Sequence, residues 1–372
     1  MYTMDPLEVA AGWVNGYEPL PMPEPGTPRT VLAELLRPHL RKSPCLVAFS
    51  GGRDSSVLLA AAVALARREG LPLPTPITLS YPDAADTDES EWQQAVLTHL
   101  GLTHRVVLTV HDEHDPLGPV ATPILRRHGL IWPPNIAPTL RMLSMARGGT
   151  LLTGEGGDEA FGLKRVTPLT KILKSRGRAS PRVYADVPKA LAPAALRRRS
   201  ALRDRYRRPW LHPDVEADLA RKDAADLTAF SLHAGRNTWQ FATRRSARIG
   251  YETVRALAAE LDVTYVQAFA EPAMVAAVAA AGGFLGWTGR AATMRSLFGD
   301  LLPREVLERR SKALFANAVF TRHTRDFARR WNGTGVDTDL VNPEALRDNW
   351  LSPTPHAPSM SLLQQAWLAQ RR

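Results

Sequence analysis

Short apolar segments that alternate with helical patterns restrict the fold of this chain more than any other feature of its sequence. The segments are Cys45–Phe49, Ile77–Tyr81, Arg105–Val110 and Thr150–Thr153, and turn-forming residues bound them. Helical patterns such as the Ala- and Leu-rich stretch Ser56–Arg68 separate them. Strands joined through helices pair in parallel, and helices then cover both faces of the sheet. The sequence therefore predicts an α/β fold with a doubly wound parallel sheet.

The second half of the chain, after about Gly162, is predicted to be largely helical. Alanine-rich helical patterns occur at Pro213–Ala225, Thr253–Leu261 and Pro272–Ala281, and one further strand is expected at Val263–Phe269. At the other end of the chain, a proline-rich leader precedes a helical pattern at residues 31–40. We expect this leader to pack as an arm on the surface.

Composition limits the class of protein. Hydrophobic residues make up 44% of the chain and charged residues 23%, as in an ordinary folded protein. No apolar run approaches the roughly 18 residues that a membrane helix needs, and the N-terminus lacks the pattern of a secretion signal. Cys45 is the only cysteine, which excludes an internal disulfide, a four-cysteine zinc site and paired-thiol chemistry. We expect a cytoplasmic protein with no membrane contact.

Positive charge is concentrated in one segment. The net charge of the chain is +10, but residues 161–210 hold 15 Lys and Arg and only Asp186 and Asp204 as acids, a local balance of +13. One interpretation is a solvated, Arg-rich helical face. The other is a docking site for an acidic leader peptide, an acidic partner protein or RNA. The aromatic residues there are too few and uneven for base stacking, which disfavours nucleic acid.

The turn between the first strand and its helix carries the clearest functional signal. It contains Ser50, Gly51, Gly52, Asp54 and the pair Ser55 and Ser56. The N-terminus of a helix favours an anion, glycine permits close approach, and hydroxyls can donate to phosphate oxygens. An aspartate would repel phosphate, but it suits Mg²⁺, which prefers carboxylate and phosphate oxygens. The alternative interpretation is a tight turn with a helix cap.

This loop is not of the Walker type, because it lacks the G-x-x-x-x-G-K-[ST] pattern. It resembles the S-G-G-x-D-S loop of the ATP pyrophosphatases, which have an adenine nucleotide α-hydrolase-like fold. Those enzymes cleave ATP between the α and β phosphates and transfer AMP to a carbonyl or carboxylate oxygen. The resemblance implies that ATP binds at this loop.

A second segment rich in glycine and acids, residues 154–162 with the sequence GEGGDEAFG, follows the strand at residues 150–153. Glycines are costly in backbone entropy, so Gly154 and Gly156 indicate close approach of a ligand, for which we expect ATP. Asp158 is expected to share one Mg²⁺ with the aspartate of the first loop. Glu155 is placed to accept a proton from an incoming amine. The alternative is an acidic loop in solvent.

The second segment resembles the G-E-G-A-D-E-L-F-G signature of the asparagine synthetase family, and with the first loop it makes a specific pair. The resemblance runs from about Cys45 to Phe320 and includes the acidic stretch Asp86–Glu89 and the turn Leu100–His104. It implies a synthetase domain that adenylates a carboxylate with ATP and Mg²⁺, releases pyrophosphate and transfers the acyl group to an amine.

Two site assignments follow only from this resemblance. Leu302–Lys312 followed by Phe315 is similar to the family's L-P-x-x-[IVL]-x-x-R-x-K-x-x-F stretch. Lys312 would then be the catalytic cation that neutralises charge when the acyl-adenylate is attacked. The family also places adenine at the end of the second strand, here about Thr78–Tyr81 and including Leu79, mainly through the backbone.

The chain departs from asparagine synthetases in two places. Residue 2 is Tyr2, where the family's glutaminase nucleophile would be a cysteine, so we expect no glutaminase domain. Nitrogen would then come as free ammonia, from a partner subunit, or as a substrate amine. In the family's E-x-R-x-P-F-L-D stretch, Thr264 and Val266 replace Glu and Arg, which disfavours aspartate as substrate.

Related enzymes that use substrate amines include β-lactam synthetases, which have Tyr at the position of Glu155, and lasso-peptide macrolactam cyclases. We therefore predict an AMP- and pyrophosphate-forming carbon–nitrogen ligase that acts on small-molecule or peptide carboxylates and amines, as in natural-product biosynthesis. The alternatives are an ammonia-dependent asparagine synthetase, a tRNA-modifying ATP pyrophosphatase and, last, a non-catalytic scaffold.

The predicted organisation has four parts. Residues 1–42 form an arm and a helix, and residues 43–162 form the nucleotide-binding core. Residues 163–210 form a basic insertion, and residues 211–372 form a helical region on the substrate side.

Overall fold

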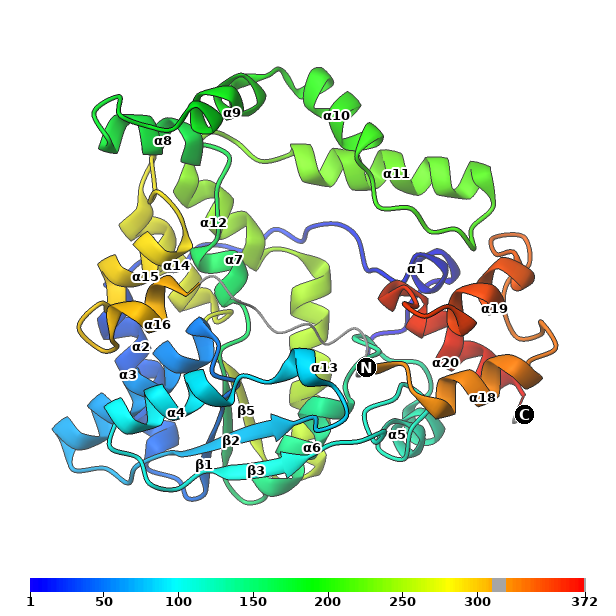
Figure 1. Cartoon of the computed structure of the whole chain (residues 1–372), viewed down its shortest axis with the longest axis horizontal. Helices are drawn as coiled ribbons and strands as arrows, with labels where there is room; N and C mark the ends of the chain where they lie inside the picture. The colour runs from blue at the N-terminus through cyan, green and yellow to red at the C-terminus, as the bar shows by residue number, and fades with distance from the viewer. Residues whose placement is uncertain (310–318, 371–372) are drawn as a thin grey trace.

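The computed structural model describes residues 1–309 and 319–370 (Figure 1). At its centre lies a five-stranded sheet in which every neighbouring pair is parallel. The strands are β1 (Cys45–Ala48), β2 (Thr75–Ser80), β3 (Val106–Thr109), β4 (Thr150–Thr153) and β5 (Thr264–Gln267). The predicted α/β class and the five strand positions are confirmed.

The strand order is β3-β2-β1-β4-β5, so the chain builds outward from β1 and then continues on its other side. Leu46 of β1 pairs with Thr75 of β2 on one side and with Leu151 of β4 on the other. The loops that follow β1 and β4 leave this reversal point side by side at the carboxyl edge of the sheet. Open α/β sheets bind ligands at that place.

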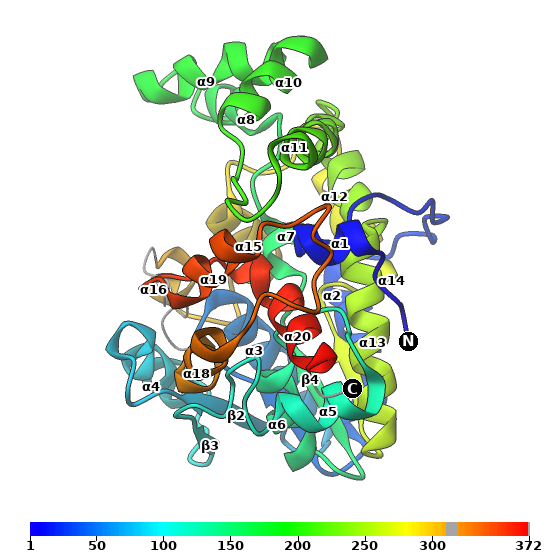
Figure 2. The ribbon, with the colours of Figure 1, turned by 90° about the vertical axis from the view of Figure 1, so that its right-hand side faces the viewer.

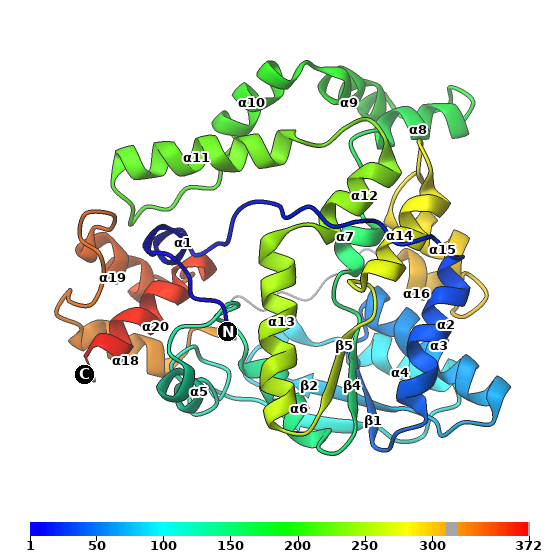
Figure 3. The same cartoon turned by 180° about the vertical axis from the view of Figure 1, so that it is seen from behind.

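Helices cover both faces of the sheet, which makes it doubly wound (Figures 1 and 3). Val47, Leu152 and Val266 project into one core, which contains residues of α2 to α4 and of α14 to α16. These helices are α2 (Pro28–Leu40), α3 (Arg53–Glu69), α4 (Ser90–His99), α14 (Pro272–Gly282), α15 (Arg290–Phe298) and α16 (Arg304–Glu308). On the other face, Leu46 and Leu151 pack against α6 (Ala137–Met145) and α13 (Arg245–Glu260).

A second apolar cluster joins the two ends of the chain. It contains residues of α1 (Pro6–Ala11), α5 (Ala121–His128), α18 (Arg322–Arg330), α19 (Pro343–Leu351) and α20 (Met360–Ala369), with the short 3₁₀ turn Ala357–Ser359 beside it. Gly12 shows how close the ends are, because a Cβ there would lie 1.8 Å from the Pro358 carbonyl oxygen.

The predicted surface arm concerned the proline-rich leader, whose residues 19–27 are exposed or half-buried, whereas α1, which precedes the leader, is packed inside. Val9, Ala10 and Ala11 are buried because they form the apolar side of a helix that packs against the C-terminal helices. Proline spacing alone did not show this. The boundaries of the predicted parts stay predictions.

The remaining helices form a layer that lies away from the sheet (Figures 1 and 2). They are α8 (Thr167–Lys174), α9 (Pro181–Leu191), α10 (Ala194–Arg203) and α11 (Pro213–Thr228), reached from the sheet through α7 (Gly157–Phe161) and followed by α12 (Ala234–Ala242). We call residues 163–210, which include α8 to α10, the basic arm. The predicted helical second half is confirmed, and no described helix combines the length and apolar character needed to cross a membrane.

Candidate active site at the carboxyl ends of β1 and β4

The loop after β1 has the geometry of an anion site. Helix α3 begins at Arg53, and no side chain caps its N-terminal N–H groups. Gly51 has φ +83°, a conformation that side-chain-bearing residues rarely adopt. The Ser55 hydroxyl donates to the Gly52 carbonyl at 3.0 Å and lies 3.2 Å from the Ser50 hydroxyl. The uncapped first turn of a long helix can therefore bind phosphate oxygens.

Side chains from other elements hold this loop through its carbonyl groups. Gln93 of α4 donates to the Ser50 carbonyl at 3.2 Å, and Arg309 donates to the Gly51 carbonyl at 2.8 Å. The Arg309 guanidinium is buried and also pairs with Glu89 at 2.6 Å. Because the carbonyls are engaged from behind, the loop is held in one conformation before a ligand arrives.

The loop after β4 packs directly on this helix N-terminus. A Cβ at Gly154 would lie 3.0 Å from the Ser55 nitrogen, and one at Gly157 would lie 2.4 Å from the Asp54 carboxyl carbon. Gly156 has φ +86°, and a Cβ there would lie 2.7 Å from the Ala270 nitrogen. The glycines are thus needed because the two loops and the segment after β5 meet at one point. The predicted close approach of ATP at Gly154 and Gly156 stays a prediction.

Asp54 and Asp158 meet around one positive charge. The guanidinium of Arg290, at the start of α15, donates to a carboxylate oxygen of each aspartate. Asp54 is mostly buried, with 18% of its side chain exposed, whereas Asp158 is 54% exposed. The two acids therefore lie close together, as predicted, but the cation between them is the Arg290 side chain, which was not predicted from the sequence.

The same donor set suits Mg²⁺. Two carboxylates close enough to share the Arg290 guanidinium could also share Mg²⁺, which favours carboxylate oxygens together with phosphate oxygens. Within residues 1–309 and 319–370, no cluster of three or more His, Cys, Asp or Glu forms a self-sufficient metal site. A metal here would therefore depend on the phosphate groups of a nucleotide.

Three guanidinium groups converge on the phosphate loop. They belong to Arg53, Arg290 and Arg309. Burial, and then the neighbouring charge of Arg290, lowers the pKa of Arg53, with a smaller effect from Arg309. Arg290 and Arg309 are paired with carboxylates, yet three guanidinium groups beside an uncapped helix N-terminus still favour a polyphosphate. Arg309 stands in the L-P stretch that resembles the family's pattern, and Arg290 stands in no motif.

Glu155 points away from this phosphate region toward β5. Its carboxylate accepts hydrogen bonds from the Tyr265 hydroxyl at 3.2 Å and from the Gln267 amide. The residue reaches solvent, yet surrounding protein desolvates the carboxyl and raises its pKa, and the nearby Glu159 adds to this effect. A carboxylate with a raised pKa is suited to act as a general base near neutral pH.

The residues that contact Glu155 alternate along β5 with the two positions singled out from the family stretch. Those positions are Thr264 and Val266, which stand where the family has Glu and Arg. Val266 packs in the core with α3 and α14, because side chains alternate between the faces of a strand. Tyr265 and Gln267 project on the opposite face and support Glu155. Counting alternate residues from Val266 could have found them.

Leu79 lies near the end of β2, and its predicted contact with adenine stays a prediction. The Phe49 N–H donates to the Ile77 carbonyl at 2.8 Å, so the polar groups of Ile77 face β1. Leu79 is two residues further along β2, so its backbone N–H and C=O groups point to the same side as those of Ile77. They lie past Ala48, the last residue of β1. This backbone edge is suited to hydrogen bonds with a purine base.

Two predicted site residues, Ser56 and Lys312, are not seen at the surface of the site among the residues that the structure describes. The Ser56 side chain is fully buried, and its hydroxyl has no hydrogen-bond partner in the described part of the chain. Lys312 falls within residues 310–318, outside the described residues, so its role stays a prediction.

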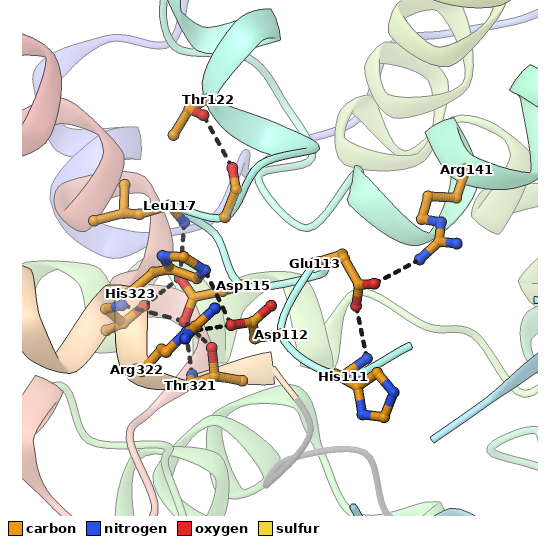
Figure 4. A network of polar contacts seen from close by, with 12 residues as sticks. His111, Asp112, Glu113, Asp115, Leu117, Thr122, Arg141, Thr321, Arg322 and His323 are labelled. Carbon is orange, nitrogen blue, oxygen red and sulfur yellow. Dashed lines mark hydrogen bonds and ion pairs between the residues drawn. The ribbon is translucent and has the colours of Figure 1, made fainter. Parts of the chain in front are cut away.

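The loop after β3 ties the C-terminal helices to the same edge of the sheet (Figure 4). Asp115 is fully buried, and its carboxylate accepts the N–H and hydroxyl of Thr321 at 2.7 and 2.9 Å. It also accepts the N–H and hydroxyl of Thr324 at 3.2 and 2.8 Å. Nearby, Asp112 forms an ion pair with Arg322. Asp115 thereby caps the start of α18 from another part of the chain.

Comparison with protein families agrees with this geometry. The family model described as asparagine synthase matches residues 29–267, which is more than half of the chain. The chain belongs to the asparagine synthase family. This family consists of ATP-dependent, ligase-type enzymes that form amides in the manner of asparagine synthetase, and they use ATP and typically Mg²⁺. No glutaminase family was matched, and no curated protein matches the sequence significantly.

The asparagine synthase match covers both glycine-rich loops, Glu155 and β5, and it ends at Gln267. The two aspartates and Glu155 thus lie inside it, whereas Arg290 and Arg309 lie beyond its end. The stretch that contains Lys312 lies beyond it, so the match gives that residue no support.

Proposed function

We propose that this asparagine synthase family member is an AMP- and pyrophosphate-forming ligase that joins a substrate carboxylate to a substrate amine. One observation carries the proposal. The uncapped N-terminus of α3, the Asp54–Asp158 pair and Glu155 lie at one edge of the sheet, at its reversal point. Phosphate-binding and proton-accepting groups are therefore adjacent but point to different sides.

In the first step, a carboxylate oxygen of the acid attacks the α-phosphorus of ATP. The bond between that phosphorus and the bridging oxygen breaks, and pyrophosphate leaves with the electron pair. Arg53 and Arg290 neutralise the charge on the leaving group, and Arg309 holds the loop through the Gly51 carbonyl. Mg²⁺, held by Asp54 and Asp158 together with phosphate oxygens, would supply further neutralisation.

In the second step, the amine attacks the carbonyl carbon of the acyl-adenylate and AMP leaves. The nitrogen must lose a proton as the amide forms, and Glu155 is the group placed to take it. The Tyr265 hydroxyl and Gln267 amide fix the orientation of that carboxylate. Burial raises the pKa of the Tyr265 phenol well above its ordinary value, so it stays a donor throughout.

We further propose that the amine belongs to a larger substrate, as in natural-product or macrolactam formation. The side chains around Glu155 are a phenol and an amide. A site for aspartate would instead need a cation to bind the carboxylate of aspartate that does not react. Ammonia-dependent asparagine synthesis makes a distinct prediction, namely pyrophosphate release with aspartate and ammonium alone.

The test is ATP–pyrophosphate exchange, screened against amino acids, other small acids and peptides. We expect Asp54→Asn and Asp158→Asn to abolish exchange with the active acid. Glu155→Gln should keep exchange and lose amide formation. Exchange that persists in both aspartate variants would contradict the assigned metal and nucleotide site. Exchange that requires aspartate would instead support the ammonia-dependent enzyme.

A further inference from the structure

The basic arm has a surface that the rest of the chain leaves uncovered. Helix α10 has no buried residue, and α9 has one, Ala190. Helices of about ten residues are marginal without packing partners. Arg165 anchors the arm by donating to the carbonyls of Ala190, Ala192 and Phe230. The arm is thus attached at its base while its outer helices stay open to solvent.

Apolar side chains are exposed along this arm. The exposed fractions are 69% for Leu163, 59% for Leu173, 44% for Tyr184, 50% for Leu191 and 59% for Leu196. Single exposed leucines are ordinary, but several on one short segment mark an interaction surface. A partner with apolar side chains could remove this apolar surface from water.

The charge of the arm defines the partner further. Of its local balance of +13 over residues 161–210, little is neutralised internally. In the described residues, the ion pairs of this segment join Lys189 to Asp186, Arg205 to Glu216 and Arg208 to Asp223. Arg198, Arg199 and Arg203 of α10 are exposed beside Leu196. A partner that complements this surface carries acidic and apolar residues together.

The arm also adjoins the candidate active site. An open pocket of about 350 Å³ lies between α8 and α9 and is lined by Lys171, Lys174, Val183 and Thr288, among others. Thr288 stands two residues before Arg290, which binds both site aspartates. At the inner end of the arm, Leu163 lies 3.6 Å from the position of a Cβ at Gly289. An occupant of the arm would therefore have part of its length next to the reacting groups.

We propose that the basic arm is the docking surface for an acidic segment of a polypeptide substrate, whose apolar side chains contact the exposed leucines. The inference rests on the proposed ligase function and names its substrate class. Lysines at the edge of the pocket pair with carboxylates of the segment, and the pocket takes one of its apolar side chains. RNA fits less well, because exposed aliphatic side chains offer nothing to a phosphate backbone.

The test uses the full chain and a labelled synthetic peptide of repeated Glu-Glu-Leu, with binding measured by fluorescence anisotropy. Three comparison probes have Lys in place of Glu, Ser in place of Leu, or are single-stranded RNA. The arm variant combines Arg198→Glu, Arg199→Glu and Arg203→Glu. A control with the same change in charge combines Arg41→Glu, Lys42→Glu and Arg147→Glu, three exposed positions before β1 and β4 at the opposite edge of the sheet.

We expect the acidic, apolar peptide to bind best and the arm variant to weaken it by about tenfold or more, with a steep dependence on salt. The control triple should change binding by less than about twofold. Leu173→Ser with Leu196→Ser should also weaken binding, whereas Leu73→Ser, at an exposed leucine outside the arm, should not.

Equal binding by the two charge variants would overturn the proposal. So would tighter binding of RNA, or a dimer that the arm variant dissociates, since the occupant would then be nucleic acid or a second copy. The binding assay contains no ATP, whereas ATP–pyrophosphate exchange tests the ligase function. Failure of exchange with intact peptide binding would count against the function, and exchange without arm-dependent binding would count against the docking surface.

Discussion

Replacing Gln267 with leucine removes the amide that donates to Glu155 and leaves a side chain of similar size in a buried position. The Tyr265 hydroxyl remains as the other donor to the carboxylate. Hydrogen bonds to the charged form lower a carboxyl pKa, whereas desolvation raises it. Loss of the amide therefore removes one of the two contacts that oppose burial, and the pKa of Glu155 must rise.

The size of the rise follows from the strength of the contact. A hydrogen bond to a charged group contributes about 1.5–3 kcal/mol, and one pKa unit corresponds to about 1.36 kcal/mol. Gln267→Leu should therefore raise the pKa of Glu155 further above its already raised value in the wild-type protein, as far as the lost contact had stabilised the charged form. The base form is present above this pKa and is lost as pH falls through it. As pH is lowered, the variant should therefore lose amide-forming activity at a higher pH than the wild type does.

The measurement is a carbon-13 NMR titration of the glutamate side-chain carboxyl groups, which needs no substrate. The Glu155 signal is identified by its absence in Glu155→Gln. Gln94→Leu makes the same change on the exposed side of α4 and serves as the control. Wild-type Glu155 should titrate above the ordinary glutamate value of 4.5, and only Gln267→Leu should move it further upward.

An ordinary or lowered midpoint for wild-type Glu155 would refute the argument from burial. An unchanged midpoint in Gln267→Leu would refute the argument from the hydrogen bond. In the first case, Glu155 would lose the property that makes it a general base near neutral pH, and the assignment of the second step would have to change. In the second case, only the positioning role of Gln267 would be lost.

Three further outcomes are expected. Arg290→Met leaves two carboxylates without their shared cation, so it should lower the free energy of unfolding by about 1–2 kcal/mol. Mg²⁺ alone should then raise the melting temperature of this variant more than that of the wild type, and equal increases would contradict the expectation. Asp115→Ala leaves the buried donors at the start of α18 unsatisfied and should cost roughly 4 kcal/mol in urea unfolding; a cost below about 1 kcal/mol would contradict the capping role. Burial raises the pKa of the Cys45 thiol to about 12, so at pH 8 it should react with a thiol reagent only after denaturation, and fast reaction of the folded protein would refute its place in β1.

Periodic patterns in the sequence identified the strands and the two glycine-rich loops. Strand and helix periods differ, and each is visible within a few neighbouring residues. Parallel strands also end at a common edge, so the strand pattern places the loops after β1 and β4 at the same edge of the sheet. Asp54, Asp158 and Glu155 were found in this way. That the two strands are neighbours came from the structure.

Contacts between distant segments were not accessible to the same reasoning. Arg290 reaches the two aspartates from a helix that begins more than a hundred residues after the second loop, and no motif marks it. Asp115 caps α18 across a similar separation, and α1 is buried only because the C-terminal helices cover it. Side chains alternate between the two faces of β5, and those of Tyr265 and Gln267 are on the face that supports Glu155. Comparison of residue types with the family pattern did not reveal this.

The sequence by itself determined the sheet, its two glycine-lined loops and the acids they carry, because hydrophobic periodicity and glycine requirements are local properties of the chain. Only the tertiary structure decided which cations surround those acids and which residues orient Glu155. Packing brings together side chains that are far apart in the sequence, and their charge and burial then set the chemistry of the site.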